Sequence, residues 1–363
     1  MTFQKRDTAA IEAISQVRQT MDQSQLDIAD TMAKVNAQHI STFRNGALER
    51  HVDRLKRSLV AHYTGDDKQH RILFIIGESH SGKTTLVEHV LRTDPAFQPY
   101  ITTDGIEAMP CLHLPAPSPC TLHNIASDGL EKLGYPIKST LTESRIWPLF
   151  REQLKRRRVI FLFIDEAQHA IKSNNSSWEI QKVRDTFKHL VQMPEWPVRL
   201  ILCGVSPLEL LRDGDKQIAS RSTVLNLGPL TEDKHGPHVR RYVELVVQEH
   251  ADLALGDFLR GDFPKRIIHA CGGCFGSIVQ LIRYAVETAL LAGEGKVLPE
   301  HFARAYADIS GCSPSSNIFT IKSWRTMEPG EARITEEPYG DSDGGGDDGG
   351  QKPKRLRAGE RRH

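Results

Sequence analysis

Two kinds of hydrophobic patterning divide this chain. From residue 71 to about residue 229, short runs in which every residue is apolar alternate with stretches that repeat apolar residues at helical spacing. Runs that are apolar throughout are typical of strands buried on both faces, as in a parallel sheet that is covered by helices. The alternation therefore predicts an α/β domain. Its five predicted strands are residues 72–76, 109–114, 159–164, 200–205 and 224–227, and its predicted helices are 83–91, 121–133, 179–191 and 208–211.

Helical spacing dominates on both sides of this region. Residues 10–30 and 51–62 are rich in Ala, Gln, Leu, Arg and Lys and contain no Pro or Gly, which favours helices. Val52, Leu55, Leu59 and Val60 fall near one face of the second segment, so we expect it to pack on the domain that follows. The more polar first segment is expected to form a mobile arm. Beyond the last predicted strand, a small α-helical domain is predicted from the segments 238–250, 263–270, 276–291 and 299–309.

The periodic pattern ends near residue 313. The remaining chain holds a Gly- and Asp-rich run at 341–350 and then a basic run at 352–362. Gly and charged residues without apolar partners cannot form a core, so a disordered tail is expected. The expected organisation is an N-terminal helical extension (1–64), an α/β domain (65–230), an α-helical domain (231–312) and a disordered tail (313–363).

Composition excludes several classes of protein. The 363 residues are 39% hydrophobic and 26% charged, as in a globular protein. Lys and Arg number 47 against 46 Asp and Glu, so the net charge of +1 gives no global basic field for nucleic acid. No apolar run approaches the roughly 20 residues of a membrane span, and no signal core is visible near the N-terminus, so we expect a cytoplasmic protein without a membrane partner. The six Cys are too sparse for a disulfide scaffold, and the close pair Cys271 and Cys274 is interpreted as two small buried residues rather than a metal site.

The strongest chemical signal is a phosphate-binding loop. The run Gly77-Glu-Ser-His-Ser-Gly-Lys-Thr84 matches the G-x-x-x-x-G-K-[ST] pattern between a buried strand and a helix. Glycines let such a loop point successive backbone N–H groups at phosphate oxygens. Lys83 would reach the β- and γ-phosphates of ATP, and the Thr84 hydroxyl would hold Mg²⁺. The expected nucleotide contacts are Gly77, Glu78, Ser79, His80, Ser81, Gly82, Lys83, Thr84, Thr85 and Asp165.

An acidic pair completes the expected site. Asp165 and Glu166 end the strand predicted at 159–164, which delivers both carboxylates to the edge of the sheet where ligands bind. Asp165 suits a partner of Mg²⁺ together with Thr84, and Glu166 suits the group that orients and polarises the attacking water.

Two further residues have open interpretations. Ser206 follows the strand 200–205 and could contact the γ-phosphate or the water, or could simply form a Ser-Pro turn. Arg221, just before the last strand, is either a surface residue or an arginine presented to a neighbour's nucleotide.

These residues carry a resemblance to a known family. The phosphate loop and acidic pair are shared by very many ATPases, whereas Asp165-Glu-Ala-Gln-His169 and Lys216-Gln-Ile-Ala-Ser-Arg221 are more specific. The chain resembles the AAA+ ATPases of transposons, namely the TniB family and its relatives TnsC and the phage Mu B protein. The likeness runs from roughly His39 to Ile309 and is carried by residues 48–59, 76–85, 163–169, 200–204, 216–221 and 273–282.

The resemblance implies both a fold and a function. The fold is an AAA+ P-loop NTPase whose five-stranded parallel sheet is flanked by helices, with a small α-helical lid. The function is an ATP-dependent regulator of transposition that oligomerises as a ring or helical filament on double-stranded DNA, without sequence specificity. Such a protein recruits and stimulates a DDE transposase of the same element and works with its target-selector protein. Hydrolysis is expected to be slow and stimulated by assembly or DNA, with Arg221 acting on the ATP of the adjacent subunit.

Two positions depart from the family's pattern. Val205 stands where the family often has Thr, and Gly276 or Ser277 stands where many AAA+ proteins carry an Arg that faces ATP. The roles of those family side chains are therefore not carried over to this chain.

Candidate DNA contacts are sparse. In relatives the segment after the second strand faces DNA, and here it offers only His113, Ser118 and Thr121, which predicts weak contacts multiplied over many subunits. Lys155 and Arg156 begin a denser basic run that could instead be a solvated helix end. The basic tail at 352–362 is a third candidate, for DNA or transposase.

Two other functions stay open at this point. The first is an AAA+ signalling or defence ATPase without a DNA partner. The second is a nucleotide-gated scaffold that binds ATP and scarcely hydrolyses it, although Lys83, Asp165 and Glu166 favour hydrolysis.

Overall fold

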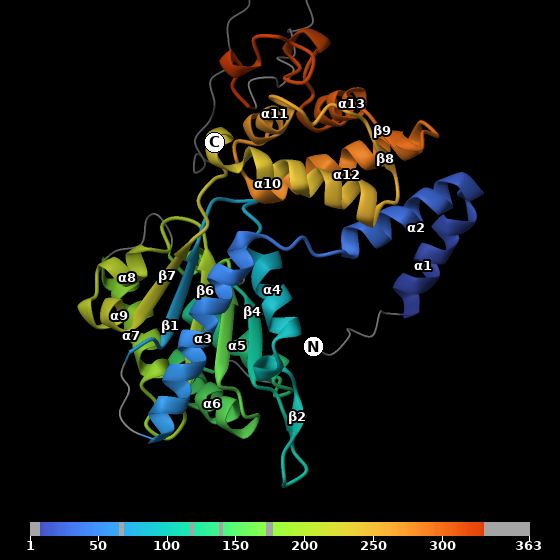
Figure 1. The fold of residues 1–363 in the computed structure, drawn as a ribbon. Coiled ribbons are helices and arrows are strands. Elements are labelled where there is room, and N and C mark those ends of the chain that lie inside the picture. Colours follow the sequence, from blue (N-terminus) through green and yellow to red (C-terminus); the bar gives the residue numbers. More distant parts are fainter. Residues whose placement is uncertain (1–7, 65–68, 117–119, 138–140, 172–176, 330–363) are drawn as a thin grey trace, which may run out of the picture.

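A five-stranded parallel sheet lies at the centre of the larger of two domains (Figure 1). The structure is a computed structural model that describes residues 8–64, 69–116, 120–137, 141–171 and 177–329. The strand order is β4-β5-β6-β1-β7, and every neighbouring pair is parallel, so all carboxyl ends meet at one edge. The strands are β1 (Ile72–Ile76), β4 (Cys111–Pro115), β5 (Phe161–Asp165), β6 (Arg199–Gly204) and β7 (Ser222–Asn226).

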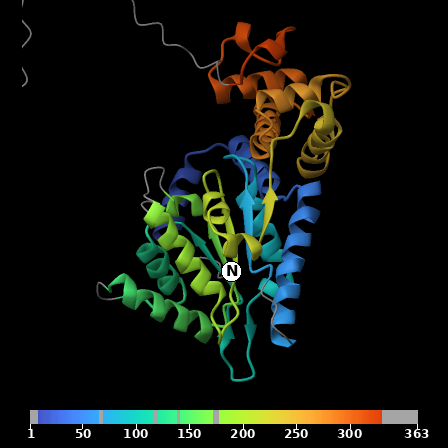
Figure 2. The ribbon, with the colours of Figure 1, turned by 90° about the vertical axis from the view of Figure 1, so that its left-hand side faces the viewer.

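Helices cover both faces of this sheet because its strands are apolar on both sides. Figure 2 shows the long helix α3 on one side of the sheet and the green helices on the other. On the first face, α3 (Phe43–Thr64) and α4 (Lys83–Thr93) pack on Leu73, Ile75 and Phe163. The second face is covered by α5 (Leu122–Lys132), α6 (Glu143–Arg156) and α7 (Ser177–Val191), and the short α8 (Leu210–Asp213) and α9 (Lys216–Ser220) lead into β7. The five predicted strands and the predicted α/β fold are confirmed.

The second domain is helical and lies beyond the carboxyl edge of the sheet (Figure 1). A continuous apolar core joins its helices, with Val243, Ile267, Ile282 and Phe302 fully enclosed. The elements are α10 (Glu232–Glu244), a π-helical turn (Leu245–His250), α11 (Phe263–Ala270), α12 (Phe275–Leu291) and α13 (Pro299–Ser310), with a small pair of strands, β8 (Ala254–Leu255) and β9 (Lys296–Val297).

The N-terminal 64 residues are helical where the structure describes them, but the second of their helices is packed on the lid and is not part of a mobile arm. Helix α2 (Gln23–Ala37) packs against α12 and contributes Met32 and Val35 to the core of the lid, whereas α3 belongs to the sheet domain. Helix α1 (Thr8–Gln19) buries no residue and is linked to α2 through the exposed ion pair of Arg18 and Asp30 at 3.1 Å. The first 64 residues are thus divided between the two domains.

The start of the disordered tail, predicted at residue 313, is placed too early in the sequence. Residues 313–329 pack on the lid because Ile318, Phe319 and Trp324 are buried in its core. Two short turns, Pro314–Ser316 and Trp324–Thr326, shape this segment. The rest of the predicted tail, with its basic run, lies outside the described residues.

Two elements of the sheet domain are not predicted from the sequence pattern. Helix α6 contains Pro148, a residue that argues against a helix interior. A two-stranded hairpin, β2 (Tyr100–Ile101) and β3 (Glu107–Ala108), projects from the end of the molecule opposite the lid (Figure 1). A short turn, Pro95–Phe97, precedes the hairpin.

No single helix in the described part of the chain is long and apolar enough to cross a membrane. Helices α11 and α12 meet that test by length and composition only as a pair, bent by 117°.

Candidate active site

The phosphate-binding motif forms the loop between β1 and α4, at the carboxyl edge of the sheet. Its first residue is tied to the neighbouring strand, since the Gly77 N–H donates to the Gly204 carbonyl at 3.3 Å. Glu78, Ser79 and His80 are exposed, whereas Ser81 is buried. Strand β1 lies between β6 and β7, where the strand order changes direction, which is where ligands bind in open α/β sheets.

Lys83 is held inside this loop. The residue is only 5% exposed, and its Nζ donates hydrogen bonds to the carbonyl oxygens of Gly77, at 2.9 Å, and Glu78, at 2.8 Å. These carbonyls fix the ammonium group over the curl of the loop. A phosphate group entering the loop would therefore meet a buried cation already in position.

The two residues expected to hold Mg²⁺ lie together. Thr84 Oγ1 donates a hydrogen bond to Asp165 Oδ2 at 2.7 Å, although the residues are far apart in sequence. Asp165 is buried at the end of β5. A hydroxyl oxygen beside a carboxylate, open to phosphate oxygens, is the donor set that Mg²⁺ takes in nucleotide sites, so these residues fit that ion.

Glu166 follows directly and is held by its own loop. Its backbone is left-handed, with φ of 51°, and its N–H donates to Asp165 Oδ1 at 2.9 Å. Gln168 Nε2 donates to Glu166 Oε2 at 2.6 Å. Gln168 is not among the predicted site residues, although it stands in the specific stretch that ends in His169. The motif contains Gln168, but the sequence alone does not show that its side chain contacts Glu166.

Ser206 reaches the same edge of the sheet but has another partner. It is exposed after the end of β6, and its Oγ lies 2.5 Å from Glu209 Oε1. This hydrogen bond within the turn favours the interpretation of Ser206 as a turn residue. A contact with the nucleotide remains a prediction.

The lid docks on the phosphate loop through backbone atoms. At the start of α12, the Gly276 N–H donates to the His80 carbonyl at 2.7 Å. A Cβ atom at Gly276 would lie 2.4 Å from that carbonyl oxygen, so only glycine permits this approach. Where many AAA+ proteins carry an arginine, this chain therefore brings the helix start itself onto the loop.

Arg44, which the sequence did not single out, joins the loop to the lid. The guanidinium donates to the Ser81 carbonyl at 2.9 Å and to the Gly228 carbonyl at 2.6 Å. It also lies 5.6 Å from the centre of the Phe275 ring. Arg44 is 5% exposed, and burial lowers the pKa of its guanidinium. The residue fixes the start of α3, the loop and α12 in one arrangement.

A cavity of about 430 Å³ opens beside these contacts. Its volume lies in the range of pockets that hold small ligands. Three segments form it, because the phosphate loop, the chain between α2 and α3, and α12 meet there. Its walls include Ser81, Thr85, His39, Arg44, Val279 and Tyr284.

We expect Gly276→Ala to weaken ATP binding by about tenfold or more, because the added methyl group pushes α12 away from His80. Titration with a fluorescent ATP analogue measures the effect. Gly236→Ala is a matched control, since Gly236 is also helical and its added Cβ would meet only Lys265 Cγ at 4.0 Å. Equal ATP affinity in both variants would show that the contact between α12 and the loop does not contribute to the site.

Arg221 lies at the opposite edge of the sheet from the phosphate loop. Its carbonyl accepts hydrogen bonds from the N–H groups of Arg71, at 2.7 Å, and Ile72, at 3.2 Å, where β1 begins. The length of β1, about 16 Å, separates that point from Gly77. Arg221 Nη1 is buried without a hydrogen-bond partner among the described residues. Because the side chain cannot span the strand, Arg221 could contact only a nucleotide bound to another molecule.

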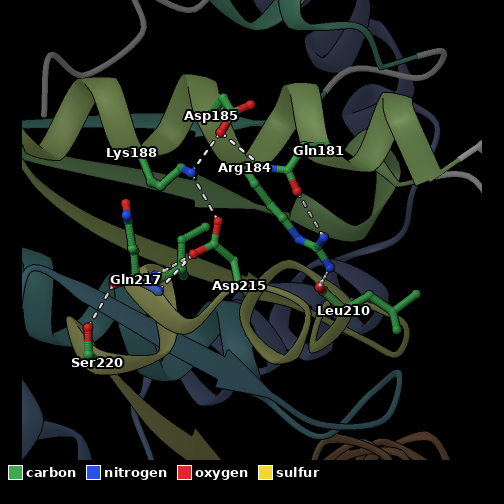
Figure 3. A network of polar contacts seen from close by, with 9 residues as sticks. Gln181, Arg184, Asp185, Lys188, Leu210, Asp215, Gln217 and Ser220 are labelled. Atoms are coloured by element: carbon green, nitrogen blue, oxygen red, sulfur yellow. Dashed lines mark hydrogen bonds and ion pairs between the residues drawn. The ribbon is translucent and has the colours of Figure 1, made fainter.

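Figure 3 shows how the helix before Arg221 is held in place. Asp215 caps α9 by accepting from the N–H groups of Gln217 and Ile218, and its other oxygen lies 3.0 Å from Lys188 Nζ on α7. Arg184, one turn before Lys188, donates to the Leu210 carbonyl. Arg221 ends this short helix, so the contacts with α7 set the position of its backbone.

The described residues among the expected DNA contacts belong to β4, to the start of α5 and to the end of α6. His113 lies within β4, where its ring stacks on Phe163 at 4.4 Å and burial lowers its pKa, and its contact with DNA stays a prediction. The Thr121 hydroxyl caps α5 by accepting from the Asn124 N–H. Ser118 lies outside the described residues. Lys155 and Arg156, at the end of α6, are exposed and pair with Glu195 at 2.8 Å and with Glu152, respectively.

The sheet order, the phosphate loop and the helical lid define an AAA+ P-loop ATPase. The family model described as Bacterial TniB protein matches residues 32–231, which is more than half of the 363 residues. The chain therefore belongs to the TniB family, as the resemblance predicted.

Solved structures agree on the fold. The Orc1 protein of Aeropyrum pernix, described in complex with DNA, is 19% identical with a TM-score of 0.53, and the match covers 75% of this chain and 66% of that one. The Orc2 protein of Aeropyrum pernix, described in ADPNP–ADP complexes, is 15% identical with a TM-score of 0.52, over 74% and 68% of the two chains. The present chain thus spans about two thirds of each. A comparison with curated proteins found no match.

Proposed function

We propose that the loop between β1 and α4 binds the phosphates of ATP and that this site hydrolyses ATP with Mg²⁺. Lys83 would bind the β- and γ-phosphates, and Thr84 and Asp165 would hold the ion, which when bound offsets phosphate charge. Glu166 would accept a hydrogen bond from the attacking water and orient it. The observation that carries this proposal is the 2.7 Å hydrogen bond that brings Thr84 against Asp165 beside the buried Lys83.

The cavity next to the loop is proposed to take the base and ribose. Ser81 and Thr85 lie at its border with the phosphate loop, and Val279 and Tyr284 offer apolar surface from α12. A nucleotide with its phosphates in the loop would extend into this space. Its binding would then bridge the sheet domain and the lid, so that ATP stabilises one arrangement of the two.

We further propose that the protein acts as a transposition regulator. It would assemble on double-stranded DNA as a ring or filament and recruit a DDE transposase together with a target selector. Membership of the TniB family supports this role, and so does the DNA complex described for the Orc1 relative in fold. The position of Arg221 supports assembly, because that residue is too far from its own loop to serve it.

One observation favours the alternative of a signalling or defence ATPase without DNA. The candidate DNA contacts are weak, since His113 is packed in the sheet and Lys155 and Arg156 are paired with carboxylates. A duplex would have to meet other residues, or the tail outside the described residues.

Filter binding with duplex DNA separates the two functions. We expect the full chain to retain DNA in ATP, with affinity that falls steeply as salt rises, because phosphate contacts release counterions. Lys83→Ala is the control and should retain DNA no better in ATP than without nucleotide. Active hydrolysis without DNA retention at any salt concentration would favour the signalling ATPase.

A further inference from the structure

The side chain of Gln168 connects three parts of the site. It projects from the short helical turn Ala167–Ala170, after the acidic pair, and is 8% exposed. Its Nε2 donates to Glu166 Oε2 at 2.6 Å, and its Oε1 accepts from the Val205 N–H at 3.1 Å. The polarity of the amide is thereby fixed, because a backbone N–H can only donate and must face the oxygen.

The end of β6 is shaped to receive this amide. A Cβ atom at Gly204 would lie 2.2 Å from Gln168 Oε1, so a side chain there would expel the glutamine. The carbonyl of the same glycine accepts from the Gly77 N–H at the start of the phosphate loop. One residue of β6 thus contacts the phosphate loop on one side and the glutamine on the other. Val205, with an apolar side chain, takes part through its backbone alone.

Glu166 depends on this arrangement for its orientation. Its backbone has φ of 51°, a left-handed conformation that is strained for a residue with a side chain. Its side chain is 43% exposed, and both Gln168 Nε2 and, at 3.9 Å, His169 Nε2 lie against the Oε2 atom. Without the amide, a half-exposed carboxylate on a strained backbone would be free to rotate.

We propose that Gln168 is a positioning residue that holds Glu166 against the end of β6, in register with the phosphate loop. The inference rests on the proposed role of Glu166 in hydrolysis. Gln168 holds one carboxylate oxygen by donation, and the other oxygen accepts from the attacking water. Its loss should lower turnover and leave ATP affinity unchanged, since Gln168 contacts the acidic residue and β6 rather than Lys83 or Thr84.

Gln168→Glu provides the sharpest test. The new carboxylate keeps an acceptor for the Val205 N–H, but it removes the donor and places a like charge against Glu166. A residue needed only to satisfy that N–H would tolerate this change. We expect single-turnover hydrolysis to fall about 10²-fold, as for a misplaced catalytic group, while the ATP dissociation constant stays within about threefold. Thermal unfolding followed in parallel reports the folded fraction.

Gly204→Ala tests the contact between Gln168 and β6 by changing the strand instead of the glutamine. We expect it to slow hydrolysis by a similar factor, and the double variant with Gln168→Ala to be no slower than the slower single variant, because both changes remove one interaction. Gly295→Ala is the control, since nothing lies within 4 Å of its added Cβ. If the fold-losses of the two single variants multiply in the double variant, Gly204 and Gln168 do not act through one interaction and the proposal is wrong.

Glu166→Gln keeps failure of this inference distinct from failure of the proposed function. If Glu166→Gln is inactive and Gln168→Glu hydrolyses at the parent rate, Gln168 has no positioning role and the proposed function stands. If Glu166→Gln itself hydrolyses at the parent rate, the role proposed for Glu166 is wrong, and this inference falls with it.

Discussion

Arg221→Ala should bind ATP as tightly as the parent chain and hydrolyse it about 10³–10⁵-fold more slowly in the assembled protein. The loss is this large because an arginine supplied by a neighbour offsets charge that develops on the transferred phosphoryl group. Arg221 lies at the amino end of β7, so it cannot supply its own loop. Nucleotide titration and steady-state hydrolysis above the assembly concentration measure the two quantities.

Mixing two inactive variants tests whether Arg221 acts on the ATP of an adjacent subunit. Lys83→Ala lacks a working phosphate loop and keeps Arg221, whereas Arg221→Ala has the reverse defect. Mixed oligomers should recover activity at interfaces that combine the intact parts. Arg212→Ala, which changes a half-buried arginine nearby on α8, is the matched control and should keep full activity. Oligomers that form but recover nothing at any mixing ratio would make Arg221 an ordinary surface residue.

Glu166→Gln is expected to bind ATP normally and to slow hydrolysis by about 10²–10⁴-fold, the usual contribution of a positioned general base. The amide keeps the size of the side chain but cannot polarise water as a carboxylate does. Because Lys83, Thr84 and Asp165 are untouched, nucleotide affinity should not fall. Single-turnover hydrolysis and equilibrium titration separate the two effects.

A surface glutamate provides the comparison for that variant. Glu195→Gln removes an exposed partner of Lys155 and should leave hydrolysis unchanged. Parent-like turnover in Glu166→Gln would remove this residue from the chemistry and return attention to other groups at the edge of the sheet.

The sheet could be predicted because its signals are local. Strand β1 begins and ends where its apolar run does, and the phosphate loop and acidic pair are contiguous motifs next to β1 and β5. The connection of these motifs in one site follows from parallel strands, whose carboxyl ends share an edge. Local pattern therefore determined the fold of the sheet domain and the residues expected in the site.

Contacts between residues that are distant in the sequence could not be predicted in this way. Arg44, Gln168 and Gly276 matter through partners that are distant in sequence, such as Ser81, Val205 and His80. None of these pairs leaves a periodic pattern, since each consists of one side chain or one missing Cβ meeting a backbone atom.

The segment after residue 312 shows that a stretch without a periodic pattern can still be ordered. Its few apolar residues, Ile318, Phe319 and Trp324, lack helical spacing and so predict no element. They are nevertheless enough to bind the segment to the lid, because each fills space in an existing core. Burial against a preformed domain does not require the segment to be periodic.

Electron microscopy of the full chain with duplex DNA, in ATP and in ADP, tests the central claim most directly. The proposed function predicts ordered rings or filaments on DNA in ATP, in which each Arg221 faces the phosphate loop of a neighbour, and dispersed particles in ADP. Dispersed monomers under both conditions, in a preparation that hydrolyses ATP at its full rate, would contradict it.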